Sequence, residues 1–176
     1  MLAGQVAAYL VGARKAERLV VGEARAQEGS HEGHGAQHGH RHANFASDRL
    51  HVRVDGDMDG RDIILIPGLA SSPEAWQGTV DHLTAQEGVG WRLHRIHVQG
   101  FAGAPAEGTA QQAGSPTPVA APVAEEIARY IREQNLNKPV VVGHSMGGTI
   151  GLMLAARHPD LVGRLMVVDM VPYLGL

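Results

Sequence analysis

The residues best suited to chemistry lie between positions 140 and 148, where the sequence reads VVVGHSMGG. The pattern predicts a buried strand, a tight G-x-S-x-G turn and the start of a helix. A serine in such a turn projects from the end of the strand and can attack a carbonyl carbon once a base accepts its proton. Ser145 is therefore the candidate nucleophile. Gly143, His144 and Gly147 complete the turn, and the two glycines relieve crowding because neither carries a β-carbon.

Attack on a carbonyl also requires hydrogen-bond donors for the oxyanion that forms. Met146 follows Ser145 at the expected start of a helix, where free N–H groups and the helix dipole favour negative charge. Its N–H is one predicted donor. The second should come from the loop at residues 67–72, which follows an earlier strand, and we prefer the N–H of Leu69 over that of Ala70. Leu69 and Met146 together form the predicted oxyanion hole.

The elements that must position these groups alternate along the chain. Apolar or alternating runs predict five strands, at residues 49–54, 63–66, 92–98, 139–142 and 165–168. Three helices are predicted, starting at Pro73, at Pro122 and at Met146, and the last reaches about Arg157. Helical spacing predicts that the first two helices bury Trp76, Val80, Leu83, Val123, Ile127, Tyr130 and Ile131. This order predicts an α/β fold with a mostly parallel sheet and flanking helices, with the first, amphipathic strand at an edge.

The first 47 residues differ from the rest of the chain. Residues 1–47 are predicted to be a flexible extension, and residues 48–176 a folded domain. Residues 2–27 are rich in alanine and could form a helix, although their apolar positions share no clean face. Five histidines interleaved with glycine follow in residues 31–42, a composition typical of a solvated linker or of a metal-binding tract. We prefer the linker and predict no metal site, because this spacing fixes no ligand geometry.

A second possible metal motif lies at residues 55–60, which read DGDMDG. This sequence matches the opening of a calcium-binding loop, whose twelfth position should be a bidentate Glu. Here the twelfth position is Ile66, inside the next predicted strand. A turn between two strands is therefore the better interpretation.

The composition limits the classes of function. The chain has 176 residues, of which 44% are hydrophobic and 19% charged, which indicates a globular protein. A net charge of -3 gives no support for binding nucleic acid or an anionic membrane. The absence of cysteine excludes disulfides, thiolate metal sites and a cysteine nucleophile. No apolar run is long enough to span a bilayer and no signal peptide or nucleotide-binding motif is found, so we expect a cytoplasmic protein without a cofactor.

These motifs resemble those of the α/β-hydrolase fold family. Residues 66–72 are similar to its oxyanion loop, although a Pro-Gly pair stands where His-Gly is commoner, and residues 143–147 are similar to its nucleophile elbow. The resemblance covers roughly residues 48–176 and implies a catalytic serine, an acid and a histidine in that chain order. It also implies a lid and further strands after the strand that ends at Asp169. We therefore expect an N-terminal portion of such a domain, truncated beyond that strand.

The acid and the base implied by the resemblance are less well determined. Asp169 lies at the end of its strand and is a candidate acid, with a structural hydrogen-bonding role as the alternative. His158 should lie about 20 Å from the serine, at the far end of the same helix. His144 should be buried, hydrogen-bonded and turned away from the serine. The sheet order that the resemblance implies places one strand between the strand of the serine and the strand that carries His94 and His97. No histidine is assigned as the base.

Two functions are left open. The first is a serine hydrolase that acts on an ester, amide or related bond of a small molecule. The second is a non-catalytic binding or interaction module with the same fold. The outer edge of the strand that ends at Asp169 should lack a partner, which predicts self-association through this edge.

Overall fold

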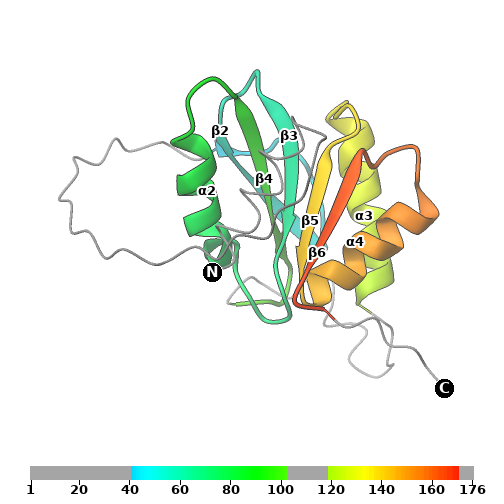
Figure 1. Ribbon diagram of the computed structural model, residues 1–176. Coiled ribbons are helices and arrows are strands. Elements are labelled where there is room, and N and C mark those ends of the chain that lie inside the picture. Colours follow the sequence, from blue (N-terminus) through cyan, green and yellow to red (C-terminus); the bar gives the residue numbers. More distant parts are fainter. Residues whose placement is uncertain (1–40, 103–118, 171–176) are drawn as a thin grey trace.

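The computed structural model describes residues 41–102 and 119–170 (Figure 1). The predicted helix at residues 2–27, the tract at 31–40 and most of the predicted loop after Gly100 lie outside these ranges. The described elements are β1 (Arg41–His42), β2 (Leu50–Gly56), β3 (Arg61–Ile66), η1 (Pro73–Trp76), α2 (Gln77–Thr84), β4 (Trp91–Val98), α3 (Ala120–Glu133), β5 (Val140–His144), α4 (Met146–Arg157) and β6 (Arg164–Val168). No described helix is both long and apolar enough to cross a membrane.

One six-stranded sheet organises the chain, in the order β1-β2-β4-β3-β5-β6. Strands β4, β3, β5 and β6 run parallel, whereas β1 and β2 are antiparallel to their neighbours. The predicted α/β fold with a mostly parallel sheet is confirmed. The predicted edge position of the first amphipathic strand is wrong, because the two-residue strand β1 pairs with the outer side of β2.

Helices cover both faces of the sheet (Figure 1). Helices α3 and α4 pack on one face and α2 on the other. Strand β3 serves both faces because its side chains alternate: Ile64 and Ile66 join the cluster under α3 and α4, while Ile63 and Leu65 join the cluster under α2. All four are fully buried, and each contributes about 1.5–3 kcal/mol by leaving water.

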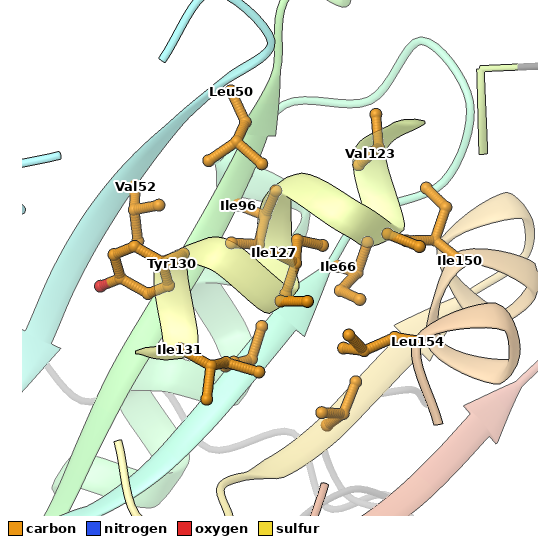
Figure 2. Packing of buried hydrophobic residues seen from close by; sticks show 14 of the residues in the cluster. Leu50, Val52, Ile66, Ile96, Val123, Ile127, Tyr130, Ile131, Ile150 and Leu154 are labelled. Atoms are coloured by element: carbon orange, nitrogen blue, oxygen red, sulfur yellow. The ribbon is translucent and has the colours of Figure 1, made fainter. Parts of the chain in front are cut away.

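The larger cluster fills the space between the sheet and α3 (Figure 2). All seven side chains predicted to be buried by the first two helices are at most 5% exposed. Helix α3 begins at Ala120, two residues before the predicted start at Pro122. Proline is tolerated there because the first turn of a helix leaves its N–H groups without intrahelical partners.

Residues 41–47 are part of the folded unit, although the sequence predicts that they belong to the flexible extension. Strand β1 pairs with β2, and the ring of Phe45 packs edge-on against Tyr130 with ring centres 5.1 Å apart. The guanidinium of Arg129 lies 4.2 Å from the centre of the Phe45 ring. The hydroxyl of Ser47 donates to Glu126 at 2.6 Å. This segment belongs to the domain because of its contacts with distant residues, which its own composition does not reveal.

The turn predicted at residues 55–60 is confirmed. It joins β2 to β3, and it is closed by a hydrogen bond from the N–H of Gly60 to the carbonyl of Asp57. In residues 41–102 and 119–170, no three His, Asp or Glu side chains are grouped so that they could hold a metal ion.

Strand β6 forms one edge of the described sheet and pairs only with β5 there. The sequence predicts a fully buried strand, but Leu165, Met166 and Val167 are only half-buried and Val168 alone is buried. These residues are less buried than predicted because α4 covers only one face of β6, and because no strand lies beside the outer edge of β6 within the described chain.

Candidate active site

The turn between β5 and α4 has an unusual backbone at Ser145. Its φ of 53° and ψ of −120° lie in a region that residues other than glycine rarely adopt. Hydrogen bonds fix this conformation: the N–H of Ser145 donates to the carbonyl of Val168 at 2.9 Å, and its carbonyl accepts from the N–H of Gly148 at 2.8 Å. The turn therefore joins the end of β5, the end of β6 and the first turn of α4.

Gly143 and Gly147 are required by close backbone approaches. A β-carbon on Gly143 would lie 2.2 Å from the carbonyl oxygen of Gly147. A β-carbon on Gly147 would lie 2.3 Å from the carbonyl oxygen of Ile66, at the end of β3. The glycines thus let α4 start directly over the carboxyl ends of β3 and β5, as the sequence pattern predicts.

The loop at residues 67–72 lies beside Ser145. A β-carbon on Gly68 would lie 3.4 Å from the β-carbon of Ser145 and 3.3 Å from Nδ1 of His144. Ala70 has a φ of 56°, and the N–H of Ser71 donates to the carbonyl of Gly68 at 3.2 Å, so the loop makes a tight turn. The structure brings this loop close to the turn that precedes α4. The two predicted oxyanion donors, Leu69 and Met146, belong to these two segments. The contact between Gly68 and the turn at Ser145 is not among the predictions made from the sequence. The Pro67-Gly68 pair is the signal that could have indicated it, because a glycine there lets another segment of backbone come close.

Leu69 and Met146 differ in their surroundings. Leu69 is 64% exposed. Met146 is the first residue of α4, and its half-buried side chain packs against the larger core cluster. By its position at the helix start the Met146 N–H has no intrahelical acceptor.

His144 and Asp169 face each other next to the turn. Nε2 of His144 lies 3.7 Å from Oδ2 of Asp169, which is beyond hydrogen-bond distance. The prediction that His144 is buried is wrong, because its side chain is 31% exposed. The side chain of Asp169 is 86% exposed, and its φ of 49° marks a sharp bend after β6. The structure thus places Asp169 and Ser145 at the carboxyl ends of two neighbouring parallel strands, β6 and β5.

The other histidines considered as bases are engaged elsewhere. His158 contacts Glu125 at 2.8 Å at the far end of α4, as its position predicts. Nε2 of His97 lies 3.0 Å from the carbonyl of Phe101. No histidine in the described part of the chain makes a hydrogen bond to Ser145.

His94 belongs to a buried polar network. Its Nδ1 lies 2.7 Å from the hydroxyl of Tyr130, and its Nε2 lies 2.9 Å from Oδ1 of Asp62. Arg92 donates to the same carboxylate oxygen at 2.6 Å. Burial raises the pKa of Asp62, but the hydrogen bonds from His94 and Arg92 outweigh it and hold this pKa below its usual value. Burial raises the pKa of the Tyr130 hydroxyl. The polar groups of His94, Tyr130, Asp62 and Arg92 bond to one another, so we assign this network a structural role.

A shallow groove of about 400 Å³ lies at the end of the sheet where β4 begins. Trp91, the first residue of β4, and Leu83 from α2 line it. Ser145 follows the carboxyl end of the parallel strand β5, so the groove and the turn lie at opposite ends of the strands. The groove is therefore separate from the candidate active site.

Known proteins resemble this chain in sequence and in fold. Residues 63–173 match the family model described as the alpha/beta hydrolase fold. The pimeloyl-[acyl-carrier protein] methyl ester esterase of Vibrio atlanticus (strain LGP32) is 31% identical over 126 residues, which are 72% of this chain and 42% of that protein. The putative carbamate hydrolase RutD of Serratia proteamaculans (strain 568) is 32% identical over 112 residues, which are 64% of this chain and 38% of that protein.

A solved structure of a marine microorganism esterase is also similar, with a TM-score of 0.58 and 27% identity over 72% of this chain and 43% of that one. The chain therefore spans less than half the length of each of these three relatives. The range matched by the family model contains the loop at residues 67–72, the turn at Ser145 and β6. The chain belongs to the alpha/beta hydrolase fold family.

Proposed function

We propose that this chain carries the nucleophile and the oxyanion hole of a serine hydrolase that acts on an ester, amide or related bond of a small molecule. The observation that carries this proposal is the backbone of Ser145, with φ 53° and ψ −120°, between β5 and α4. A residue held in such a region costs about 1–3 kcal/mol, and such strain is concentrated at functional sites. Gly143 and Gly147 serve the same turn, which supports a role for the serine itself.

In this mechanism the Oγ of Ser145 attacks the carbonyl carbon of the substrate and passes its proton to a base. The carbonyl oxygen becomes an oxyanion and accepts hydrogen bonds from the N–H groups of Met146 and Leu69. The positive end of the α4 dipole adds to this stabilisation. Loss of one such donor typically removes about 3 kcal/mol of transition-state stabilisation.

The base is proposed to be a histidine from outside the described residues, since the described histidines are engaged elsewhere or lack a bond to the serine. Two roles are open to Asp169: it could orient that base, or it could hold His144 beside the loop at residues 67–72. Asp169→Asn and His144→Gln distinguish these roles. A rate of Ser145 acylation that falls by orders of magnitude in Asp169→Asn alone assigns the acid role. If the rate of Ser145 acylation falls equally in both variants, the role of Asp169 is to hold His144.

The relatives suggest which substrates to test first. One is named a methyl ester esterase and another a putative carbamate hydrolase. Both names describe compounds with an acyl carbonyl carbon, which is the atom that a serine nucleophile attacks. Small activated esters and carbamates are therefore the first substrates to assay with this chain.

Labelling with a fluorophosphonate tests the proposal directly. The folded protein and its Ser145→Ala variant are incubated with the probe, with and without added imidazole as an external base. Labelling that depends on Ser145 supports the proposal, and acceleration by imidazole supports a base that lies outside the chain as tested. If a folded protein is not labelled under either condition, the hydrolase function is wrong for this chain, and a non-catalytic binding module is the function to pursue.

A further inference from the structure

A buried arginine lies on the face of the sheet that α2 covers. Arg95, in the middle of β4, is 1% exposed. Its Nε and Nη2 each donate to one oxygen of Asp55 in the neighbouring strand β2, both at 2.8 Å. Asp55 is 8% exposed, so both charges are removed from water and paired through a planar, two-pronged contact.

The remaining nitrogen of Arg95 contacts the segment that follows the loop at residues 67–72. Nη1 donates to the side-chain oxygen of Gln77 at 2.9 Å and approaches the carbonyl of Pro73 at 3.4 Å. Pro73 is the first residue of η1, and Gln77 is the first residue of α2. One guanidinium therefore connects two strands to the start of two consecutive helical elements.

Further contacts hold the same segment. Arg53 of β2 forms an ion pair with Glu74 of η1, and the ring of Trp76 is 1% exposed in the core under α2. At its other end the loop continues from β3 and contacts the turn at Gly68. Six residues, 67–72, thus bridge two points that the sheet holds in place, and the predicted oxyanion donor Leu69 lies between them.

Stability alone does not explain a buried ion pair. Removing two charges from water is costly, and apolar residues of similar volume often serve folding equally well or better. What Arg95 provides beyond an apolar side chain is direction, because its rigid fork holds Asp55, Gln77 and Pro73 in one fixed arrangement.

We propose that Arg95 is a positioning residue for the oxyanion hole: through Pro73 and Gln77 it fixes the loop at residues 67–72, and with it the N–H of Leu69, relative to Ser145. This inference rests on the proposed function. It assigns Arg95 no contact with substrate and no part in proton transfer.

The test compares variants that keep the fold. Arg95→Met alone leaves the carboxylate of Asp55 buried without a partner and is expected to unfold readily. The double variant Arg95→Met with Asp55→Leu removes both charges, so it is expected to stay folded. Gln77→Ala removes one acceptor at an exposed position and keeps the ion pair. Tyr130→Phe is the matched control, since it removes the hydrogen bond to His94, the neighbour of Arg95, on the opposite face of the sheet.

Two readouts are measured in each folded variant. The first is hydrogen exchange at the amides of Ser71 and Ala75, which bond to Gly68 and Ser72 in the native loop. The second is the rate of fluorophosphonate labelling at Ser145. We expect the double variant to exchange faster at both amides and to be labelled at least about tenfold more slowly, because a displacement of about 1 Å in a catalytic arrangement can cost about a hundredfold in rate. Gln77→Ala should shift both readouts in the same direction by about threefold, and Tyr130→Phe should shift neither.

A folded double variant whose labelling rate equals that of the wild type overturns the proposal, whether or not its amides exchange faster. If the wild type is not labelled at all, the proposed function fails for this chain. The exchange data then decide separately whether Arg95 positions the loop, and unchanged exchange in the double variant rejects that role.

Discussion

Gly147 lies so close to Ile66 that a β-carbon on the glycine would be 2.3 Å from the carbonyl oxygen of the isoleucine. The first turn of α4 therefore rests directly on the end of β3, where the loop at residues 67–72 begins. The same β-carbon would lie 2.6 Å from the carbonyl oxygen of Pro67. This contact sets how far the two predicted oxyanion donors lie from each other, because one belongs to the helix and the other to the loop.

Gly147→Ala is consequently expected to separate α4 from the loop. Backbone atoms cannot yield as a side chain can, so overpacking here should destabilise the fold by about 1–3 kcal/mol. Gly151→Ala, in the same helix, is the matched control. Its β-carbon would meet the end of the Leu165 side chain at 2.9 Å, which can rotate away. Both variants gain similar helix propensity, about 1 kcal/mol.

Urea denaturation of the two variants provides the measurement, with fluorophosphonate labelling of Ser145 as a second readout. We expect Gly151→Ala to unfold within about 1 kcal/mol of the wild type, and Gly147→Ala to be both less stable and labelled more slowly. Equal stability of the two variants would show that the close approach at Ile66 does not constrain the turn.

The sequence predicts elements well where local pattern determines structure. Continuous apolar runs that end at proline or glycine locate β3 and β5, because burial and backbone freedom are encoded in neighbouring residues. The G-x-S-x-G spacing likewise predicts the turn at Ser145. Its environment depends on residues far along the chain, such as Ile66 and Val168.

Features made by long-range contacts could not be predicted in the same way. Asp55 and Arg95 are forty residues apart and meet only because β2 pairs with β4. The exposure of His144 and the half-burial of β6 depend on which elements cover the end of the sheet. Phe45 joins the core through Arg129 and Tyr130, although its neighbours in sequence are polar or small.

The network around Asp62 predicts an acid-sensitive contribution to stability. The pKa of Asp62 is lowered in the folded protein, since burial, which raises it, is outweighed by the hydrogen bonds from His94 and Arg92. Its contribution should therefore be complete above the unfolded-state pKa of about 4. It should be lost as the pH falls through the lower folded-state value.

Asp62→Asn tests this expectation through the free energy of unfolding measured from pH 7 down to pH 3. The variant should be less stable than the wild type at pH 7, and the difference should shrink below about pH 4. Glu87→Gln, at an exposed position, is the control for general loss of a negative charge. A difference between wild type and Asp62→Asn that is independent of pH would contradict the role given to this carboxylate.

The contacts of Phe45 predict that residues 41–47 stabilise the folded domain. Phe45→Ala removes the edge-on contact with Tyr130 and the stacking of Arg129, and the ring is half-buried, so a loss of about 1–3 kcal/mol is expected. Asn44→Ala is the control, because the contact at this position is made by the backbone carbonyl, which accepts from Gln134. Urea midpoints measure both, and equal midpoints would place this segment outside the cooperative unit.

The outer edge of β6 predicts self-association of the 176-residue chain in solution. Within the described residues β6 pairs only with β5, and exposed strand edges of apolar sequence recruit strands from other molecules. Leu165 and Val167 contact the glycines of α4, whereas Met166 belongs to the cluster on the opposite face and is half-buried there. A charge at Met166 should therefore oppose pairing without disturbing α4.

Light scattering after size-exclusion chromatography, over a range of protein concentrations, gives the mass of the wild type and of Met166→Lys. We expect the wild type to show a mass that rises with concentration, and Met166→Lys to remain closer to a monomer, since lysine is a residue that natural edges use to block pairing. Leu152→Lys is the control, because it removes an apolar side chain that is 40% exposed on α4 and leaves the strand edge unchanged. A wild type that stays monomeric at all concentrations would rule out pairing through β6, and an equal effect of Leu152→Lys would move the interface from the strand edge to the surface of α4.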